Sequence, residues 1–336
     1  MNIVGIETSC DETSVAVLSG AHILSSFTFS QADIHAVFGG VVPEVASRNH
    51  MQKIAPLFRK AMAHAGLDLQ DIDLIAVTSA PGLIGALFVG VSFAKGLAFA
   101  MDKPIIPIHH LAGHILSAEL SNPELKPPYT ALVVSGGHTH IYDVTEENGQ
   151  QPSFRLIGRT IDDAAGEAFD KVAKMLGGQY PGGPFIEKLA MDGDSQSIKF
   201  PIALRGEQNL SFSGLKTAVL TKIEQHTHEA KDIAASFQYT VAKTVQEKAF
   251  AAAKAAGRNK IVVTGGVSCN GALRRHFAQA VEAEGLQVYF PEIQLCNDNA
   301  AMIAYAAYRM TQNTDIAEYK DLSFAAGDTR HEIDVA

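Results

Sequence analysis

The stretch NIVGIETSCDETSVAVLS (residues 2–19) holds two short apolar runs on either side of a small polar segment. The runs 2–8 and 14–19 predict two strands, and the segment SCDET (9–13) predicts the tight turn between them. A further alternating run, HILSSFTF (22–29), predicts a third strand. The chain is therefore expected to begin as a three-stranded meander.

After the meander, helices and strands are predicted to alternate. Residues 43–66 predict a helix, because Pro43 stands at the start, apolar residues recur at helical spacing and Gly66 ends the pattern. The other elements expected up to residue 110 are a strand at 73–82, an apolar helix at 83–100 and a strand at 103–110.

The second part of the chain partly repeats this order, beginning with two strands joined by Gly-Gly within 129–144. Expected after them are helices at 163–177, 214–225 and 229–256, a strand, glycine turn and helix at 260–285, a strand at 286–292, and a helix at 298–310 capped by Asp298. The repeat predicts an α/β fold of two related lobes with a cleft between them. We expect the first lobe at 1–110 plus about 293–336 and the second at 111–292.

Composition limits the class of protein. The chain has 336 residues, 47% of them hydrophobic, and its 27 basic and 36 acidic residues give a net charge of −9. That sign disfavours binding of nucleic acid by bulk charge, but leaves open a local basic strip such as ALRRHF (272–277) with Arg258 and Lys260. The apolar stretch 82–100 is broken by Lys95 and four glycines, so it predicts a buried helix rather than a membrane span. Without a signal-peptide pattern, a cytoplasmic protein is expected.

Three strands end in loops of small residues, at GIETSCDET (5–13), LVVSGGHT (132–139) and IVVTGGVSCN (261–270). Glycine lets the backbone reach positive φ and approach a ligand, and successive N–H groups can then bind an anion. One such loop is ordinary, but three of them predict a nucleotide held between two lobes. The loops match neither GxxxxGK[ST] nor GxGxxG, which disfavours P-loop and dinucleotide folds.

The segment HHLAGH (109–114) holds a possible half of a metal site. His110 and His114 are four residues apart and would share one helical face, although a histidine-rich helix start is the simpler interpretation of the motif by itself. A zinc peptidase of the HExxH type needs a glutamate after the first histidine, and this chain has Leu111 there. The peptidase hypothesis therefore lacks its catalytic base.

The three loops resemble those of the actin-like superfamily of sugar kinases, acetate kinase and Hsp70. In more detail, a series of motifs resembles the universal tRNA threonylcarbamoyladenosine transferase family, whose bacterial branch is TsaD and which was formerly described as O-sialoglycoprotein endopeptidase. The motifs run in order from residue 3 to about 305: GIETSCDETSVAV, FGGVVPEVASRNH, HHLAGH, LVVSGGHTH, IDDAAGEAFDKVAK, YPGGP, LSFSGLKT, GGVSCNGALR and CNDNAAMIAY. The resemblance implies an actin-like (ASKHA) fold.

The resemblance also implies an activity and a metal. The family transfers a threonylcarbamoyl group from threonylcarbamoyl-AMP to N6 of adenosine 37, in tRNAs that read codons beginning with adenine, and AMP leaves. The resemblance implies that Asp298 is the third metal ligand, beside His110 and His114. Two histidines and one carboxylate suit one Fe²⁺ per subunit, with Zn²⁺ a plausible alternative.

Further site residues follow from the resemblance. Asp170 is expected at the ribose, Gly183 at the nucleoside, and Asn270 at the adenine or ribose. A second ribose contact is expected at Glu187, although it is a longer acid than the aspartate expected there. The residues expected around the adenylate or its acyl group are Val133, Val134, Ser135, Gly136 and Gly137.

In the first loop, Glu12 is the candidate for assisting proton transfer, with Asp11 its close competitor; ordinary turn chemistry explains both as well. The implied partners are tRNA, a TsaB-like paralogue and a small TsaE-like ATPase, and no membrane. The predicted helices 43–66 and 83–100 could contact the paralogue, although core packing is favoured for most of 83–100.

Three other functions compete with the transferase. An actin-like ATPase or small-molecule kinase shares the nucleotide loops but does not need the HxxxH motif with Asp298. A non-catalytic scaffold would be expected to have lost these ligands, and this chain keeps all three. A metallopeptidase is weakened by Leu111.

Overall fold

The computed structural model describes residues 1–147 and 149–327. The chain divides into two compact units, which are described separately. Of the described residues, the first unit comprises Met1–Glu124, Thr145–Phe154 and 297–327, and the second comprises Leu125–Val144 and Arg155–Cys296.

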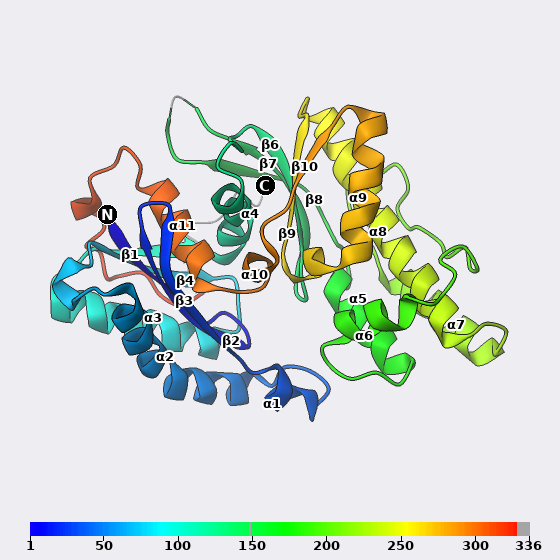
Figure 1. Cartoon of the computed structure of the whole chain (residues 1–336), viewed down its shortest axis with the longest axis horizontal. Helices are drawn as coiled ribbons and strands as arrows, with labels where there is room; N and C mark the ends of the chain where they lie inside the picture. The colour runs from blue at the N-terminus through cyan, green and yellow to red at the C-terminus, as the bar shows by residue number, and fades with distance from the viewer. Residues whose placement is uncertain (148, 328–336) are drawn as a thin grey trace. The chain divides into compact units, whose positions relative to one another are not determined.

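The first unit is built on a five-stranded sheet (Figure 1) with the order β3-β2-β1-β4-β5. Strand β1 pairs antiparallel with β2 and parallel with β4, and Gly5 lies opposite Ala16 on one side and Ala76 on the other. This confirms the predicted meander. The strands are β1 (Asn2–Glu7), β2 (Glu12–Ser19), β3 (His22–Ser30), β4 (Leu74–Ala80) and β5 (Ile105–His109). The helices are α1 (Ala32–Ala36), α2 (Pro43–Ala65), α3 (Ile84–Met101), α4 (His110–Ser121) and α11 (Ala300–Met310), with short 3-10 turns at Leu69–Asp71 and Ile316–Glu318.

The two faces of this sheet carry different helices. Val4 and Ile6 on β1 belong to the buried cluster formed with α2 and α3. Gly5 faces α11 instead: a Cβ placed there would lie 2.2 Å from the carbonyl oxygen of Ala300. Gly5 therefore allows helix–sheet packing and lies within the strand, whereas the sequence had suggested that it belongs to an anion-binding loop.

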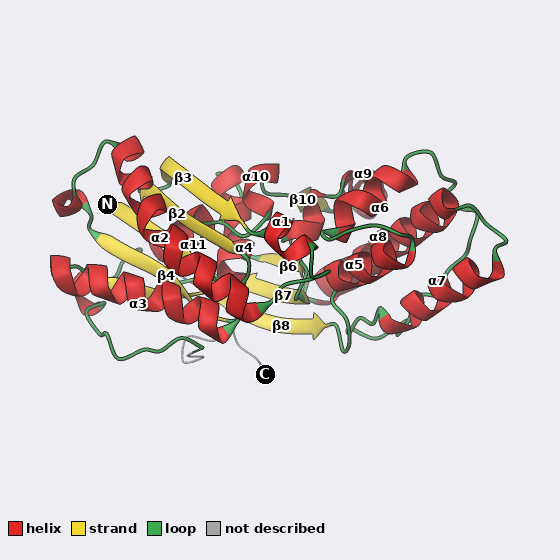
Figure 2. Cartoon of the chain, turned by 90° about the horizontal axis from the view of Figure 1, so that it is seen from below, coloured by secondary structure: helices red, strands yellow, loops and turns green. Residues whose placement is uncertain are grey.

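Helix α3 is less buried than its composition predicts. Only 33% of the residues of this helix are buried. By length and composition alone, the helix could cross a membrane. One face, with Val91, Ala94 and Ala98, joins the core under the sheet. On the other side Phe88 and Phe99 are 65% and 81% exposed. The prediction that most of 83–100 is core is therefore wrong, because only one face of the helix packs. Figure 2 shows α3 beside α2.

The second unit has a five-stranded sheet of order β10-β9-β6-β7-β8. Strand β6 pairs antiparallel with β7 and parallel with β9. A meander followed by parallel strands is also the order of the first unit, so the predicted duplication is present. The strands are β6 (Tyr129–Val134), β7 (Thr139–Thr145), β8 (Ser153–Arg159), β9 (Lys260–Thr264) and β10 (Gln287–Tyr289). The helices are α5 (Ala165–Met175), α6 (Gly182–Ala190), α7 (Ser213–Gln225), α8 (Ala230–Ala255), α9 (Gly271–Glu284) and α10 (Ile293–Cys296), with a 3-10 turn at Gly266–Cys269.

The compact units differ from the lobe boundaries expected at 110/111 and 292/293. Helix α4 falls in the first unit because it packs along α11, and the segment Thr145–Phe154 joins it there. Residues 328–336, which were expected in the first lobe, lie outside the described residues. The lobe boundaries themselves stay a proposal.

Candidate metal centre and nucleotide site

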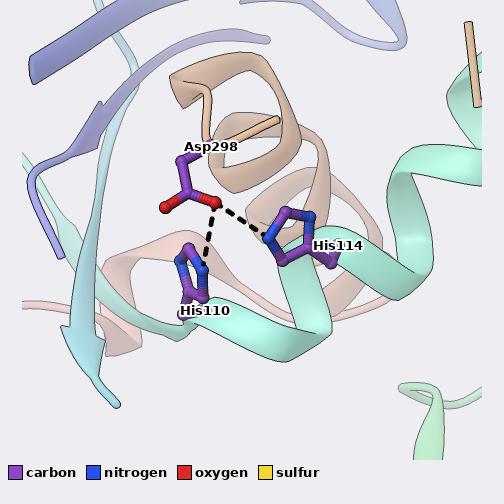
Figure 3. Close-up of side chains that lie close together, drawn as sticks. All are labelled: His110, His114 and Asp298. Carbon is purple, nitrogen blue, oxygen red and sulfur yellow. Dashed lines mark hydrogen bonds and ion pairs between the residues drawn. The ribbon is translucent and has the colours of Figure 1, made fainter. Parts of the chain in front are cut away.

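Three potential metal ligands converge in the first unit. Helix α4 begins directly after β5, so His110 and His114 lie on its first two turns and point the same way (Figure 3). The Asp298 Oδ1 atom lies 3.0 Å from Nε2 of His114 and 3.5 Å from Nε2 of His110. One ligand atom from each residue falls within 4.8 Å of the others. The predicted histidine pair and its predicted carboxylate therefore meet at one point.

Asp298 is not the cap of the following helix, which corrects the sequence prediction. Asn299 is the cap, and its Oδ1 accepts a hydrogen bond from the Met302 N–H at 2.9 Å. The Ala300 N–H donates to the Ser14 hydroxyl at 2.9 Å. Since two other side chains satisfy the start of α11, the Asp298 carboxylate is turned toward the histidines.

Glu7, at the end of β1, is a site residue that the sequence analysis missed. It is fully buried, and its Oε2 lies 3.0 Å from Nδ1 of His110. The Thr78 hydroxyl and the Ser9 N–H also donate to this carboxylate. A carboxylate on one imidazole nitrogen leaves the other nitrogen for a metal and fixes the ring, as is usual around metal-bound histidines. The sequence feature that could have predicted this residue is an acidic side chain at the end of an otherwise apolar strand.

The charges in this cluster balance one another. Burial lowers the pKa of His110, but the Asp298 and Glu7 carboxylates outweigh it and raise that pKa well above its usual range. Burial likewise raises the pKa of Asp298, but His110 reverses the effect and holds it far below its usual range. The two carboxylates thus stabilise the protonated, positively charged form of His110. A divalent cation would replace that proton and be stabilised by the same negative charges.

Several predicted substrate residues come together in the second unit. The loop after β6 contacts the start of α5, because the Gly166 N–H donates to the Ser135 carbonyl at 3.1 Å and a Cβ on Gly166 would lie 2.8 Å from Gly136. Gly136 and Gly137 are exposed and have open space where a Cβ would be. This loop is therefore open to a ligand at its glycines.

At the starts of α6 and α9, a backbone N–H group donates a hydrogen bond to the carboxylate of a predicted site residue. Asp170, on α5, accepts a hydrogen bond from the Gly182 N–H at 2.6 Å. Glu187, on α6, accepts one from the Gly271 N–H at 2.7 Å. Asn270 caps α9 through the Leu273 N–H at 2.9 Å. The predicted residues thus link α5 to the start of α6, and α6 to the start of α9.

Two features of the predicted loops differ from expectation. Neither Gly136 nor Gly137 has positive φ; of the loop glycines that were expected to need it, Gly265 does, with φ at 92°. A Cβ on Gly265 would lie 2.5 Å from the Val134 carbonyl oxygen, so this glycine also serves packing. The side chains of Val133 and Val134 are buried within the sheet. Any contact of these two valines with a ligand would have to use their backbone.

Comparison with known proteins assigns the family. The family model described as TsaD, tRNA N6-adenosine threonylcarbamoyltransferase, matches residues 22–305. The chain belongs to the TsaD family. Proteins named tRNA N6-adenosine threonylcarbamoyltransferase from Thermosipho africanus and Thermosipho melanesiensis are 48% and 50% identical to it, covering 92% and 94% of this chain and 94% and 96% of theirs. The Moorella thermoacetica protein of the same name is 48% identical and covers 94% of each chain.

Solved structures confirm the predicted actin-like fold. Full-length HypF in a phosphate- and nucleotide-bound form superposes with a TM-score of 0.62 at 16% identity, covering 92% of this chain and 46% of that one. Component A of the Acidaminococcus fermentans (R)-2-hydroxyglutaryl-CoA dehydratase gives 0.56 at 17% identity, covering 92% and 98%. At these identities the likeness concerns the fold alone.

The donor set of this TsaD-family chain fits a borderline transition metal. Two imidazole nitrogens and one carboxylate oxygen leave coordination positions open, as in sites for Fe²⁺ or catalytic Zn²⁺. Mg²⁺ and Ca²⁺ prefer oxygen ligands, which this set supplies only once. The residues present therefore fit the metal implied by the resemblance, although they do not distinguish iron from zinc.

The predicted acid Glu12 is the first residue of β2 in this TsaD-family chain. Its Oε1 accepts a hydrogen bond from the Ser30 hydroxyl at 3.1 Å. Burial, and then the nearby Asp298 and Asp11 carboxylates, raise the pKa of Glu12 well above its usual range. Its competitor Asp11 is buried. Glu12 is therefore within electrostatic reach of the metal ligands.

Proposed function

We propose that the chain transfers the threonylcarbamoyl group of threonylcarbamoyl-AMP to N6 of adenosine 37, in tRNAs that read codons beginning with adenine, and releases AMP. The observation that carries this proposal is the convergence of His110, His114 and Asp298 in a chain that belongs to the TsaD family. The glycine loop at 135–137, open at the surface of the second unit, supports a role in binding the adenylate.

The metal would be held by His110, His114 and Asp298, as one Fe²⁺ per chain with Zn²⁺ the alternative. When bound, it would supply Lewis-acid polarisation of the carbamoyl or phosphate oxygens. Glu7 would keep the His110 ring oriented through its 3.0 Å contact. The chain's own contribution here is to place a fixed set of ligands with positions open to substrate.

The adenylate would be held by residues of the second unit. The backbone N–H groups of 135–137 can donate to its oxygens. We assign Asp170 to the ribose, Gly183 and Asn270 to the nucleoside, and Glu187 to a second ribose contact. Asp170 and Glu187 already accept the N–H groups at the starts of α6 and α9, which holds both carboxylates in place.

In the transfer step, the adenine N6 attacks the carbamoyl carbon, and the bond from that carbon to the phosphate oxygen breaks. AMP leaves with the bonding pair, and N6 loses one proton. We assign that proton to Glu12, because burial raises the pKa of this carboxyl and its ionised form is therefore a stronger proton acceptor than an ordinary carboxylate. Because the amine is a weak nucleophile, positioning is expected to contribute more than the base.

Single-turnover transfer of labelled threonylcarbamoyl to unmodified tRNA tests the step. Glu12→Gln should lower the rate about 100-fold with little change in metal content, within the range for loss of an acid–base group. An equal loss in Asp11→Asn, with Glu12→Gln unaffected, would assign the role to Asp11. If the chain instead hydrolysed ATP or phosphorylated a small molecule and made no transfer, the actin-like ATPase or kinase function would replace this one.

We further propose that the exposed apolar face of α2 and α3 binds a TsaB-like paralogue. Met51 on α2 and Ile84 and Phe88 on α3 are each more than 60% exposed. An apolar surface of this kind on packed helices is typical of a protein interface. Phe88→Asp should abolish co-elution with the paralogue, whereas Leu220→Asp on α7 should not. Unchanged co-elution of Phe88→Asp would exclude this face.

The remaining partners we propose are tRNA and a TsaE-like ATPase, in the cytoplasm. The net charge of −9 requires local basic groups for tRNA. Three cations of the strip suggested by the sequence have internal partners. Arg258 pairs with Asp143, Lys260 donates to the Lys126 carbonyl, and Arg274 donates to the Ser268 carbonyl. Of these three, Arg258 has its charge balanced by a carboxylate, whereas the neutral carbonyl partners of Lys260 and Arg274 leave their charges in place.

A further inference from the structure

Helices α4 and α11, which position the metal ligands, pack closely along one another in the first unit. His110 and His114 lie on the first turns of α4, and Asp298 directly precedes the cap of α11. At this end a Cβ on Gly113 would lie 2.8 Å from Ile303 Cδ1. The two helices are therefore in van der Waals contact one residue away from His114.

A buried ion pair ties the same two helices at their other ends. Arg309, on the last turn of α11, pairs through Nη1 with the Glu119 carboxylate, near the end of α4. Its Nη2 donates to the Glu146 carboxylate. Arg309 and Glu119 are 4% and 2% exposed. All three side chains belong to the first unit.

The two contacts between the helices, Gly113 with Ile303 and Glu119 with Arg309, are the same distance apart along α4 and along α11. Glu119 lies six positions after Gly113 on α4, and Arg309 lies six positions after Ile303 on α11. At 1.5 Å per residue, each interval is about 9 Å. The helices therefore run in the same direction, and the ion pair prevents either from sliding past the other without separating two buried charges.

Stability alone is a poor explanation for this pair. Taking a carboxylate and a guanidinium out of water costs several kcal/mol each, and apolar residues of similar volume often serve as well or better. Burial lowers the pKa of Arg309, in accordance with that cost. A buried ion pair is better suited to fixing one arrangement, because breaking it leaves a charge unpaired.

We propose that Glu119 and Arg309 are positioning residues of the metal centre. Their ion pair fixes the alignment of α4 along α11 and thereby sets the separation of His110 and His114 from Asp298. This inference rests on the proposed metal site. According to this inference, an ion pair at the C-terminal ends of the two helices positions the metal ligands at their N-terminal ends.

Cobalt titration of the metal-stripped full chain tests the inference, with the visible absorption of bound Co²⁺ as a second readout. The wild type should bind one Co²⁺ per chain, and His114→Ala should not bind it. The double variant Glu119→Gln/Arg309→Met removes the two buried charges together. The Glu146 carboxylate that loses Arg309 is partly exposed and can be solvated, so the variant should keep a thermal midpoint close to that of the wild type. We expect its Co²⁺ affinity to fall about 10-fold or more, with an altered absorption spectrum.

Two further variants separate positioning from general loss of stability. Arg309→Lys keeps the charge and should recover most of the Co²⁺ affinity. Phe58→Leu, in the core on the α2 side of the sheet, should lower the thermal midpoint without changing Co²⁺ affinity. An equal loss of affinity in Phe58→Leu would overturn the inference, since the effect would then follow stability.

Each remaining outcome is decisive. If the double variant binds Co²⁺ with unchanged affinity and spectrum, the positioning role is wrong while the metal site stands. If the double variant does not fold, Glu119→Asp, which shortens the carboxylate's reach, must weaken Co²⁺ binding for the inference to survive. If the wild type binds no Co²⁺, or His114→Ala binds it equally well, the metal site itself is wrong and the inference fails with it.

Discussion

At the scale of single residues, the site depends on side chains whose partners are distant in sequence. Glu7 on β1 orients His110 on α4, and Asp298 reaches both histidines from just before α11. Gly5, two residues before Glu7, lets α11 approach the sheet. Strand β1 thus orients one ligand, His110, and leaves room for the helix that follows Asp298.

Replacing Glu7 tests the orienting role. Glu7→Gln keeps the shape but loses the charge, so the His110 ring is held less firmly. We expect metal affinity to fall about 10- to 100-fold, as for other groups that hydrogen-bond metal ligands. Co²⁺ titration measures it, with the exposed Glu44→Gln as control. Equal affinities in the two variants would contradict the role.

Replacing Gly5 tests the packing role. Gly5→Ala places a methyl group 2.2 Å from the Ala300 carbonyl oxygen, so α11 must shift. We expect a loss of about 1–3 kcal/mol in the free energy of unfolding, the usual cost of overpacking, together with weaker metal binding. Gly96→Ala on α3 is the matched control, since its Cβ meets open space. It should stabilise the chain by up to about 1 kcal/mol. Gly5→Ala would be incompatible with this account if it unfolded like the wild type.

At the scale of elements, periodicity and turn residues predicted the long helices and the buried strands. Strand β8 was missed because its exposed, half-buried and buried positions do not alternate regularly, which gives it a weak apolar pattern. Helix α6 was missed because it begins Gly-Gly-Pro, which is typical of a loop. The exposed side of α3 could not be predicted, since its composition is apolar on every face.

The carboxylate of Asp143 ties elements of the second unit together. Asp143 on β7 accepts hydrogen bonds from Arg258, just before β9, and from Arg155 on β8. Burial raises the pKa of Asp143, but the two guanidinium groups outweigh it and leave the pKa below its usual value. Its stabilising contribution is therefore complete above the unfolded pKa, near 4, and is lost as the pH falls through the lower folded value.

Asp143→Asn should accordingly lower the free energy of unfolding by about 1–3 kcal/mol at pH 7, because hydrogen bonds to charged groups are lost. The difference from the wild type should shrink as the pH falls below about 4. Urea unfolding between pH 3 and pH 7 measures it. A difference that stayed constant over this range would rule out the ionic origin.

At the scale of the whole molecule, two units share one strand order and carry different chemistry. The first gathers the metal ligands and the second gathers the predicted adenylate residues. The metal ligands could be predicted because His110 and His114 form a helical pair and family resemblance supplies Asp298. Glu7, Glu119 and Arg309 could not, since their function depends on contacts between elements that no local pattern encodes.

The central claim is that His110, His114 and Asp298 hold the metal for threonylcarbamoyl transfer. The most direct test measures transfer of labelled threonylcarbamoyl from threonylcarbamoyl-AMP to unmodified tRNA, with the paralogue and the ATPase present. The wild type should label the tRNA, and Asp298→Asn should lose about 100-fold or more of the rate together with its bound metal. The exposed Asp102→Asn should behave like the wild type. Full transfer by a metal-free Asp298→Asn chain would contradict the account.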